Sequence, residues 1–494
     1  MGRDAVDAVV VGAGPNGLTA AITLATAGLE VRLYEADDAV GGAVRTVDLT
    51  RPGFRHDRGS AVHPFGVGSP VFAALPLADH GLHWLQPPLP LAHPFDDGPP
   101  AVLGRSFADT VDGLGAGGPG YRALLRPFVG RWDALAGEVL RPVLSVPRHP
   151  LLLARFGPRA LLPITAVAGR LRGDAAPALL AGMAGHTGAA LSAPLSTGPA
   201  LMLALAGHEV GWPVPRGGAQ AIADALAGHL RTLGGTITTS HRVRSLDELP
   251  DARAYLLDVS PWALPTLAGS RLPARYLRRL GRYRHGPGVF KLDYALAGPV
   301  PWRDEHCRRA GTLHLGGTMP EIAAELDAVT RGDAPTRPLV IAAQPTIVDP
   351  SRAPDGQHTL WAYAHVPNGW PGDLSTEIES QIERFAPGFR DLVLERVATS
   401  PAQLEAHDAN LVGGDLADGA FAGRQALFRP VVAAVPYATP DPAVFLCSAA
   451  TPPGPAVHGA CGFQAARVAL RRVFGRRVPG SPFETLGQAR HDGC

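Results

Sequence analysis

Three glycines near the N-terminus have the spacing that brings a protein backbone close to a phosphate group. Gly12, Gly14 and Gly17 follow the run "VVV" and lead into "LTAAITLATAG". In a strand-to-helix turn, the first glycine permits the tight turn, the second admits a pyrophosphate, and the third lets helix and strand pack closely. Glu35 follows about 20 residues later, where a carboxylate can accept both hydroxyls of an adenosine ribose. The spacing therefore predicts a dinucleotide site, and the acid argues against a 2′-phosphate.

A second glycine pair follows shortly after Glu35. In "GGAVRT", Gly41 and Gly42 precede Arg45 and Thr46. A glycine pair lets the chain pass close beside a pyrophosphate, and an arginine three residues further on can supply the countercharge. Nicotinamide-dependent enzymes have no need for this second phosphate-side segment, so the pattern favours a flavin dinucleotide.

Other side chains with chemical potential are few and scattered. Lys291 is the only lysine among 45 lysines and arginines, and it lies in the apolar stretch "PGVFKLDYAL". The residues alone leave it open whether this lysine is functional or merely solvated. The cysteines form no C-x-x-C pair, which disfavours a redox dithiol and a zinc site, and no metal is expected. They are Cys307, Cys447, Cys461 and Cys494.

Regular elements must position these residues. The run "AVVV" is typical of a buried parallel strand, the segment up to Gly28 predicts a helix, and "EVRLYEA" predicts a second strand that ends at Glu35. At 494 residues the chain is too long for one core, so two interleaved domains are expected.

The net charge of +1 gives no argument for nucleic-acid binding. Without a long apolar run or a signal peptide, a cytoplasmic protein is expected.

With these motifs, the sequence resembles the FAD-binding flavoproteins of the amine oxidase and phytoene desaturase superfamily, which join a strand-helix-strand unit to a Gly-Gly-x-x-Arg-Ser/Thr tail. The segment "GWPVPRGGAQAIADALAGHLRTLGGTITTSHRV" is similar to the family's glycine entry, a helix at about 219–233 and a return strand. The run "TPPGPAVHGACG" resembles a phytoene desaturase-like subgroup labelled pyridine nucleotide-disulphide oxidoreductase domain-containing. The resemblance implies FAD, held noncovalently.

The resemblance also implies where the cofactor is held. Val243 would contact the adenine through its backbone, and a final helix opened by Gly462 would point its N-terminus at the flavin pyrimidine. Many relatives carry an acid at the end of the last strand, where this chain has Ser448 and Ala449, so backbone groups around Ala450 are expected to replace it. The predicted cofactor contacts are Gly12, Gly14, Pro15, Asn16, Gly17, Glu35, Ala36, Gly41, Gly42, Arg45, Thr46, Gly59, Ser60, Val243, Ala450, Gly459, Gly462 and Phe463.

Two residues are implied to take part in the reaction. In the family, a lysine at the position of Lys291 holds a water at flavin N5, where a cation can assist proton transfer or reoxidation. His458 lies in the loop expected to pass the flavin, where it would act as an acid or base, hydrogen-bond the flavin or a phosphate, or merely fix a glycine-rich turn. His63 lies in a segment similar to the family's third flavin contact, where backbone groups are favoured over the imidazole.

Two long inserts separate the FAD-binding segments. In residues 76–205, "PLLLARFGPRALLPITAVAGRL" predicts helices whose apolar face covers a substrate, contacts lipid or packs inside the protein. In residues 271–438, "GVFKLDYAL", "PLVIAAQPT" and "HTLWAYAHV" predict an antiparallel sheet beneath a substrate cavity. The glycines of 113–120 follow a polar stretch rather than a strand, so a loop before one helix over 121–140 is expected there and not a second dinucleotide site.

The expected fold is α/β, a Rossmann-like FAD-binding domain assembled from discontinuous segments, with an α+β substrate domain. The FAD-binding domain would comprise 1–75, 206–270 and 439–476, the substrate domain 76–205 and 271–438, and a loosely ordered tail 477–494. The favoured activity is desaturation or isomerisation of an apolar small molecule by hydride transfer to flavin N5. Electrons would then pass to dioxygen, a quinone or a partner protein. Flavin-dependent amine oxidation and a non-catalytic FAD-stabilised scaffold are the alternatives.

Overall fold

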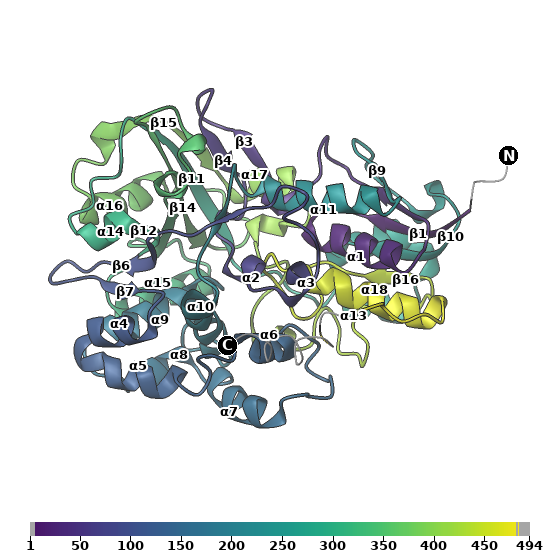
Figure 1. Ribbon diagram of the computed structural model, residues 1–494, viewed down its shortest axis with the longest axis horizontal. Coiled ribbons are helices and arrows are strands. Elements are labelled where there is room, and N and C mark those ends of the chain that lie inside the picture. The colour runs from purple at the N-terminus through teal and green to yellow at the C-terminus, as the bar shows by residue number, and fades with distance from the viewer. Residues whose placement is uncertain (1–4, 481–482, 484–494) are drawn as a thin grey trace.

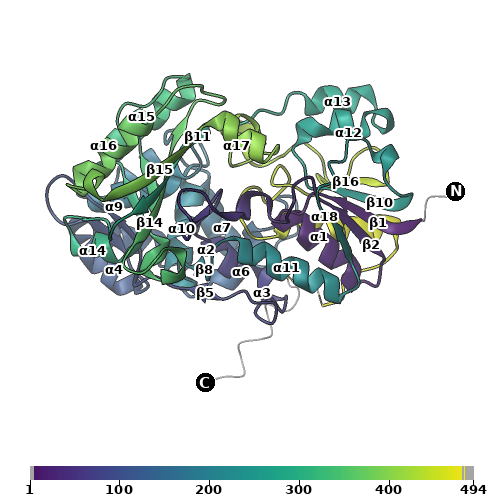
Figure 2. The same ribbon diagram turned by 90° about the horizontal axis from the view of Figure 1, so that it is seen from above.

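The computed structural model describes residues 5–480 and residue 483, and these residues form two lobes around two separate sheets (Figures 1 and 2). The first sheet has five parallel strands in the order β16-β10-β1-β2-β9. Its strands are β1 (Val6–Val11), β2 (Val31–Tyr34), β9 (Thr236–Thr238), β10 (Ala252–Leu257) and β16 (Val444–Leu446).

Helices cover both faces of the first sheet. α1 (Pro15–Thr26) packs between α11 (Gln220–Thr232) and α18 (Ala460–Val473) on one face. On the other face, α12 (Leu264–Ala268) and α13 (Ala274–Leu280) contribute to a core with Val9 and Leu257 (Figure 2). Helix layers on both faces exclude water from the sheet, which explains why β1 is an almost continuous run of buried valines.

The predicted strand-helix-strand unit is confirmed, and its glycines have steric reasons. Gly12 has a φ of 99°, which suits glycine, as β1 turns into α1. A Cβ on Gly17 would lie 2.0 Å from the carbonyl oxygen of Gly12, so only glycine lets helix and strand approach this closely. Pro15 occupies the first turn of α1, where its missing N–H leaves no helix hydrogen bond unmade.

The second sheet has seven strands in the order β15-β11-β14-β13-β12-β6-β7, and all its pairs except β12 with β6 are antiparallel. The predicted antiparallel sheet is therefore confirmed, and two of its expected strands have the predicted length. The strands are β6 (Leu89–His93), β7 (Ala101–Leu103), β11 (Gly288–Leu296), β12 (Ala310–Leu315), β13 (Val340–Ala343), β14 (His358–Val366) and β15 (Val393–Thr399).

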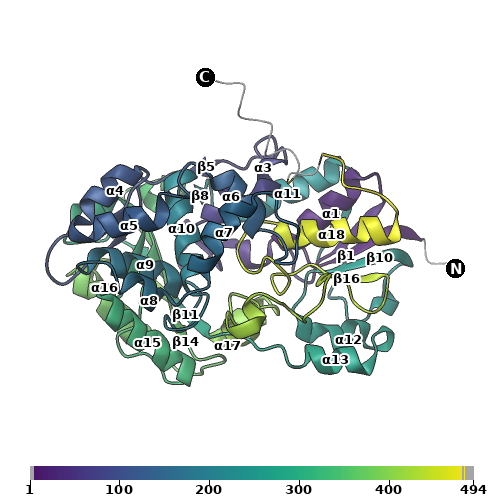
Figure 3. The ribbon, with the colours of Figure 1, turned by 90° about the horizontal axis from the view of Figure 1, so that it is seen from below.

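Helices also enclose this second sheet. α14 (Glu305–Arg309), α15 (Met319–Arg331) and α16 (Ser375–Phe385) follow its strands, and Ile378 and Phe385 pack on one face. The helical insert covers the other face, forms the lower part of Figure 1, and is seen from below in Figure 3. Its helices are α4 (Phe107–Gly113), α5 (Gly118–Leu125), α6 (Trp132–Val139), α7 (Pro150–Ala160), α8 (Ile164–Ala168), α9 (Ala175–Gly185) and α10 (Thr197–Glu209).

Short elements connect the two lobes. The hairpin of β3 and β4 leads from the glycine pair toward the second sheet, and α17 lies between β11 and the first sheet in Figure 2. These elements are α2 (Pro64–Val67), α3 (Pro70–Ala73), α17 (Pro401–His407), β3 (Thr46–Asp48), β4 (Arg55–Asp57), β5 (Trp84–Leu85) and β8 (Val214–Pro215).

Three details differ from expectation. Residues 113–120 are mostly helical rather than a loop, because a Cβ on Gly118 would lie 2.0 Å from the carbonyl oxygen of Val111 and glycine lets α4 and α5 pack together. The single helix over 121–140 is two helices, interrupted where Gly130 has a φ of 77°. The last helix begins at Ala460, so Gly462 lies inside its first turn.

The strands divide between the lobes along the predicted boundaries. Every strand of the first sheet comes from 1–75, 206–270 or 439–476, and every strand of the second from 76–205 or 271–438. We therefore propose the predicted division into FAD-binding and substrate domains. Most of the predicted tail 477–494 lies outside the described residues.

Candidate functional site

A cleft of about 950 Å³ lies between the two lobes, a size at the upper end for small-molecule and cofactor sites. Its walls include the β1–α1 turn, the end of β2, the end of β10, α17 and the edge of the second sheet formed by β11 and β15. Of the predicted site residues, the cleft is lined by Gly12, Gly14, Pro15, Asn16, Glu35, Ala36, Gly42, Val243 and Lys291.

The β1–α1 turn forms a backbone cradle at the cleft. Gly14 precedes α1, and a Cβ on Gly42 would lie 3.5 Å from the Cα of Gly14, so the two glycine segments approach each other closely. The side-chain oxygen of Asn16 is buried here without a hydrogen-bond partner. The backbone N–H groups at a helix N-terminus have the chemistry of an anion-binding site, whereas the Asn16 oxygen is an acceptor that suits a hydroxyl of the ligand.

Glu35 occupies the predicted position after β2 and is held by the backbone. Its carboxylate accepts hydrogen bonds from the N–H groups of Ala13, at 2.6 Å, and Asp37, at 2.9 Å. A carboxylate has about four acceptor sites, so these two bonds leave room for ribose hydroxyls. Arg242, Val243 and Arg244 line the same part of the cleft.

The arginine nearest the second glycine pair does not face the cleft. Arg45 pairs with Asp37 at 2.8 Å and with Asp38 at 3.2 Å, and it is absent from the lining. Arg58 lines the cleft instead, and its guanidinium hydrogen-bonds the ring of His407 at 2.7 Å. The expected countercharge for a pyrophosphate is therefore better supplied by Arg58.

Lys291 lies on β11 at the wall of the cleft and is only 2% exposed. Its ammonium forms an ion pair with Asp293, two residues along the same strand face, and lies 5.8 Å from the ring centroid of Trp361. Burial lowers the pKa of Lys291, and the Asp293 carboxylate opposes that shift. The lysine is therefore not an ordinary solvated residue.

A buried polar network continues from this pair to the FAD-binding lobe. The second oxygen of Asp293 lies 3.6 Å from the ring of His56, whose pKa burial lowers to about 3, so the imidazole is neutral at neutral pH. Next to His56, Asp57 forms a 2.8 Å ion pair with Arg352. Asp57 also accepts hydrogen bonds from the backbone of Ala219 and from the predicted contact Thr46.

In the segment after β16, only Ser448 and Ala449 line the cleft. The residues that follow support the cleft by packing. Gly459 begins α18 with a φ of 67°, and a Cβ on Gly462 would lie 1.9 Å from the carbonyl oxygen of Asn16, so α18 packs against the start of α1. Phe463 is buried within this packing.

His458 also belongs to this supporting layer. It is buried and absent from the cleft lining, and its ring accepts a hydrogen bond from the N–H of Ala460 at 3.1 Å. Burial lowers the pKa of His458 to about 4, so the ring is neutral at neutral pH. This geometry matches the turn-fixing interpretation, and a role in the reaction stays a prediction.

The remaining predicted residues lie in a layer behind the cleft. Gly59 and Ser60 pack on Ala43, where a Cβ on Gly59 would lie 2.2 Å from the Ala43 carbonyl oxygen. Gly17 donates its N–H to the Asp258 carboxylate, and the side chain of Arg45 lies against Gly41. The layer comprises Gly17, Gly41, Arg45, Thr46, Gly59, Ser60, His63, Ala450, Gly459, Gly462 and Phe463.

Several acids and bases that line the cleft were not predicted from the sequence, and Asp258, Asp418 and Arg58 are the ones that bear on the cofactor. The others are Asp37, Asp408, Arg242, Arg244 and His407. Asp258 directly follows β10, and ligands of parallel sheets bind outside the carboxyl ends of the strands. Its position after an apolar strand would therefore have allowed its prediction from the sequence. Arg58 and Asp418 lie in loops, and the sequence gives no sign of where these loops run.

The residues present fit a dinucleotide. The cleft extends from Glu35 and Val243, past the glycine cradle and Arg58, to Lys291. Its donors are backbone N–H groups and the guanidinium groups of Arg58, Arg242 and Arg244, which suit phosphates, and its acceptors are carboxylates, which suit sugar hydroxyls. A dinucleotide has the same order of sugar, pyrophosphate and second ring.

Several known proteins are similar to this chain. Residues 10–75 match the NAD(P)-binding Rossmann-like domain family. The chain is 26% identical to pyridine nucleotide-disulfide oxidoreductase domain-containing protein 2 of Rattus norvegicus, over 94% of this chain and 93% of that protein. It is 34% identical to the hydroxyneurosporene desaturase of Rhodobacter capsulatus over 156 residues, 30% of each chain. These matches confirm the predicted resemblance.

The solved structures support the fold. Putrescine oxidase bound to putrescine aligns with a TM-score of 0.60 at 19% identity, over 95% of this chain and 98% of that one. The predicted α/β fold class with a Rossmann-like domain is therefore confirmed.

Proposed function

From this kinship we propose that the chain is an FAD-dependent oxidoreductase that acts on an apolar small molecule in the manner of a phytoene desaturase. One observation supports the proposal most directly. The glycine cradle, Glu35 and the buried Lys291 all line the same cleft. Bound FAD would accept a hydride at its N5 atom. The cysteines Cys307, Cys447 and Cys461 are buried and unpaired in the described part of the chain, which argues against disulfide chemistry despite the rat relative's name.

Apolar side chains in the cleft that contains Lys291 favour an apolar substrate. Val397, Leu404 and Leu411 line the cleft on β15, α17 and the loop that follows α17. Apolar walls exclude water, so they hold a hydrocarbon and protect a hydride in transfer. The Lys291 ammonium, fixed by Asp293, would hold a water or a proton at the edge of this site.

Anaerobic mixing tests this proposal. A polyene substrate should bleach the flavin absorbance of the loaded protein, whereas a primary amine should leave it unchanged. Bleaching by the amine alone would favour amine oxidation, for which the putrescine oxidase fold is a precedent. No bleaching by any candidate would favour the scaffold alternative. The acceptor that restores absorbance after bleaching, dioxygen or a quinone, would identify the route by which electrons leave.

We also propose that the helical insert contacts a membrane surface. Among the described residues, no helix is long and apolar enough to cross a bilayer. However, six of the nine exposed large apolar side chains of the described residues lie between Val143 and Leu162. Exposed Arg148, Arg155 and Arg170 lie in or near the same segment, and residues 139–173 contain no acid. Exposed apolar groups with arginines match an anionic lipid surface.

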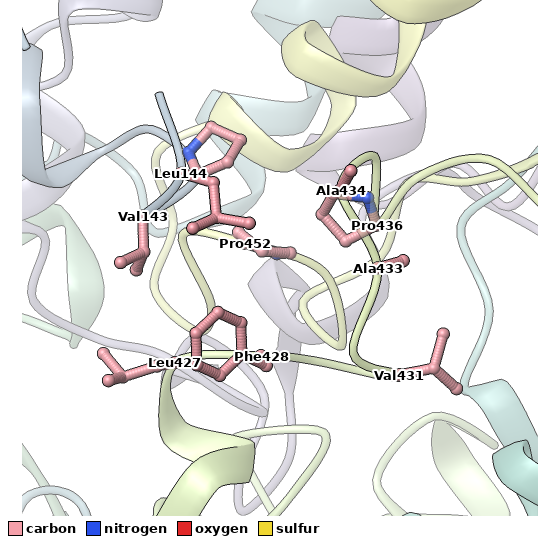
Figure 4. Close-up of a pocket in the computed structure, with 10 residues that line it drawn as sticks. Val143, Leu144, Leu427, Phe428, Val431, Ala433, Ala434, Pro436 and Pro452 are labelled. Atoms are coloured by element: carbon pink, nitrogen blue, oxygen red, sulfur yellow. The ribbon is translucent and has the colours of Figure 1, made fainter. Parts of the chain in front are cut away.

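An apolar pocket opens beside this segment. Val143 and Leu144 lie opposite Leu427 and Phe428, with Pro452 between them (Figure 4). Pro452 belongs to the loop that follows β16 and borders the cleft residues Ser448 and Ala449. The pocket holds only about 10 Å³, about the space of one water molecule, so it is an apolar contact between this segment and the neighbouring loops and not a passage.

Replacing Leu151, Leu161 and Leu162 together by serine should weaken binding to anionic vesicles by at least about tenfold, because each leucine is worth about 1.5–3 kcal/mol when buried in lipid. Cosedimentation with phosphatidylglycerol vesicles measures the binding of each variant. Trp262→Ser, an exposed apolar residue just before α12, is the matched control and should bind like wild type. Equal binding by the triple variant and wild type would contradict the proposal.

A further inference from the structure

The last strand of the first sheet ends beside a carboxylate that comes from elsewhere in the chain. β16 is followed by Cys447, Ser448, Ala449 and Ala450, none of which is acidic. Asp418 lies against this end, where it accepts hydrogen bonds from the Ser448 hydroxyl at 3.0 Å and the Ala450 N–H at 3.1 Å. The carboxylate at the end of β16 therefore belongs to a residue 30 positions before Ser448 in the sequence.

Only one oxygen of Asp418 is used in these contacts. Both hydrogen bonds go to Oδ2, whereas Oδ1 is buried with no hydrogen-bond partner. Asp418 is 3% exposed and lines the cleft. A buried carboxylate oxygen without a donor is costly, so its presence at a ligand cleft points to a donor that arrives with the ligand.

The backbone of Asp418 is clamped in place. Its carbonyl oxygen accepts hydrogen bonds from the Tyr283 hydroxyl and from the Arg429 guanidinium. Its φ is 44°, a left-handed conformation that aspartate and asparagine tolerate better than most residues. Arg429 is 1% exposed and also bonds the carbonyl oxygen of Ala417, so the loop is rigid at this point. The side chain is held in place before any ligand binds.

The loop that carries Asp418 spans the two parts of the cleft. Its beginning lies against β11, where a Cβ on Gly288 would lie 2.3 Å from the Gly413 carbonyl oxygen. Its end meets β16 through Asp418. Asp418 thus lies on a loop that joins the strand carrying Lys291 to the first sheet, and it lines the same cleft as Lys291 and the glycine cradle. In a bound flavin dinucleotide, the polyhydroxyl chain lies between the pyrophosphate and the ring.

We infer that Asp418 is a cofactor-binding residue that accepts a hydrogen bond from a ribitol hydroxyl of FAD through Oδ1. The inference rests on the proposed function, because it needs FAD in the cleft. Ser448 also lines the cleft, but its hydroxyl donates to Oδ2 of Asp418 and so acts as a positioning residue for this carboxylate.

The charges around Asp418 make this contact sensitive to pH. Burial raises the pKa of Asp418 to about 7, and Arg429 and His285 oppose the shift while Asp415 adds to it. Asp258 also faces Asp418 across the cleft, and Tyr283 contacts its backbone. A hydroxyl donating to Oδ1 favours the ionised carboxylate, so FAD binding lowers the pKa of Asp418. By linkage, FAD affinity should rise with pH up to about 7 and level off above it.

Asp418→Asn keeps the size and the tolerance for the left-handed backbone but removes the charge. Apoprotein is titrated with FAD from about pH 5.5 to about pH 8.5, roughly 1.5 units on either side of the raised pKa of about 7. The quenching of FAD fluorescence gives the dissociation constant. The variant should bind FAD about 10- to 100-fold more weakly at the alkaline end, because a charge-assisted hydrogen bond is lost. It should also lack the pH step. Ser448→Ala should bind a few-fold more weakly and keep the step.

Asp415→Asn is the matched control. Asp415 is equally buried but bonds three backbone N–H groups, those of Gly286, Ala417 and Gly419, and it does not line the cleft. This variant should keep the pH step, moved to lower pH because one negative charge that raises the pKa of Asp418 is gone. Equal FAD affinity and an equal pH step in folded Asp418→Asn and wild type would overturn the inference. Absence of FAD binding by wild type would instead overturn the proposed function.

Discussion

Lys291→Met is expected to slow flavin reduction or reoxidation by about 100-fold or more, the usual loss when a group that assists proton transfer is removed. The same change should lower the free energy of unfolding by about 3–5 kcal/mol, because Asp293 would be left buried without its partner. Stopped-flow flavin absorbance measures each half-reaction, and urea unfolding measures stability. Lys291→Arg should restore little of the rate, since a planar guanidinium cannot direct one donor at one water.

The double variant Lys291→Met with Asp293→Asn separates these two effects. Neutralising Asp293 removes the buried charge, so the double variant should recover most of the lost stability. It should not recover the rate, because the cation is still absent. Wild-type rates in both half-reactions for the double variant would show that the lysine only balances a buried acid.

Glu35→Arg is expected to weaken FAD binding by more than Glu35→Gln, for which about 1.5–3 kcal/mol is expected. The carboxylate would lose its ribose contacts, and the arginine cannot accept from hydroxyls or from the N–H groups of Ala13 and Asp37. Fluorescence titration of the apoprotein with FAD measures the loss.

Glu30→Gln is the control for Glu35. Glu30 lies just before β2, pairs with Arg32 on the surface and does not line the cleft, so its loss should leave FAD binding unchanged. Equal FAD affinity for wild type and Glu35→Arg would show that the ribose is not bound at the end of β2.

Local sequence patterns were enough to predict the framework of the protein. The valines of β1, the glycines at 12, 14 and 17 and the acid at 35 lie within one strand-helix-strand unit, so their geometry follows from neighbouring residues. The strand around Lys291 was also predictable, because its apolar run is long and has clear ends. That Lys291 would be neutralised by Asp293 follows from strand periodicity, since residues two apart share a face.

Long-range contacts account for what the sequence could not reveal. Arg58 lines the cleft in place of Arg45 because Asp37 and Asp38 hold the Arg45 guanidinium, a competition that spacing does not show. Asp418 reaches the end of β16 only through a loop fixed by Tyr283 and Arg429. The helical glycines at 113–120 likewise depend on packing, whereas the break between α5 and α6 is a local effect of the left-handed backbone at Gly130.

Identification of the bound nucleotide tests the central claim most directly. Purified protein should be yellow, and heat should release a nucleotide that chromatographs as FAD, because the cleft addresses both halves of a flavin dinucleotide. If the protein is purified without cofactor, added FAD should restore the colour. Release of NAD alone, or failure to retain any nucleotide after incubation with FAD, would contradict the assignment of this cleft and the function proposed for it.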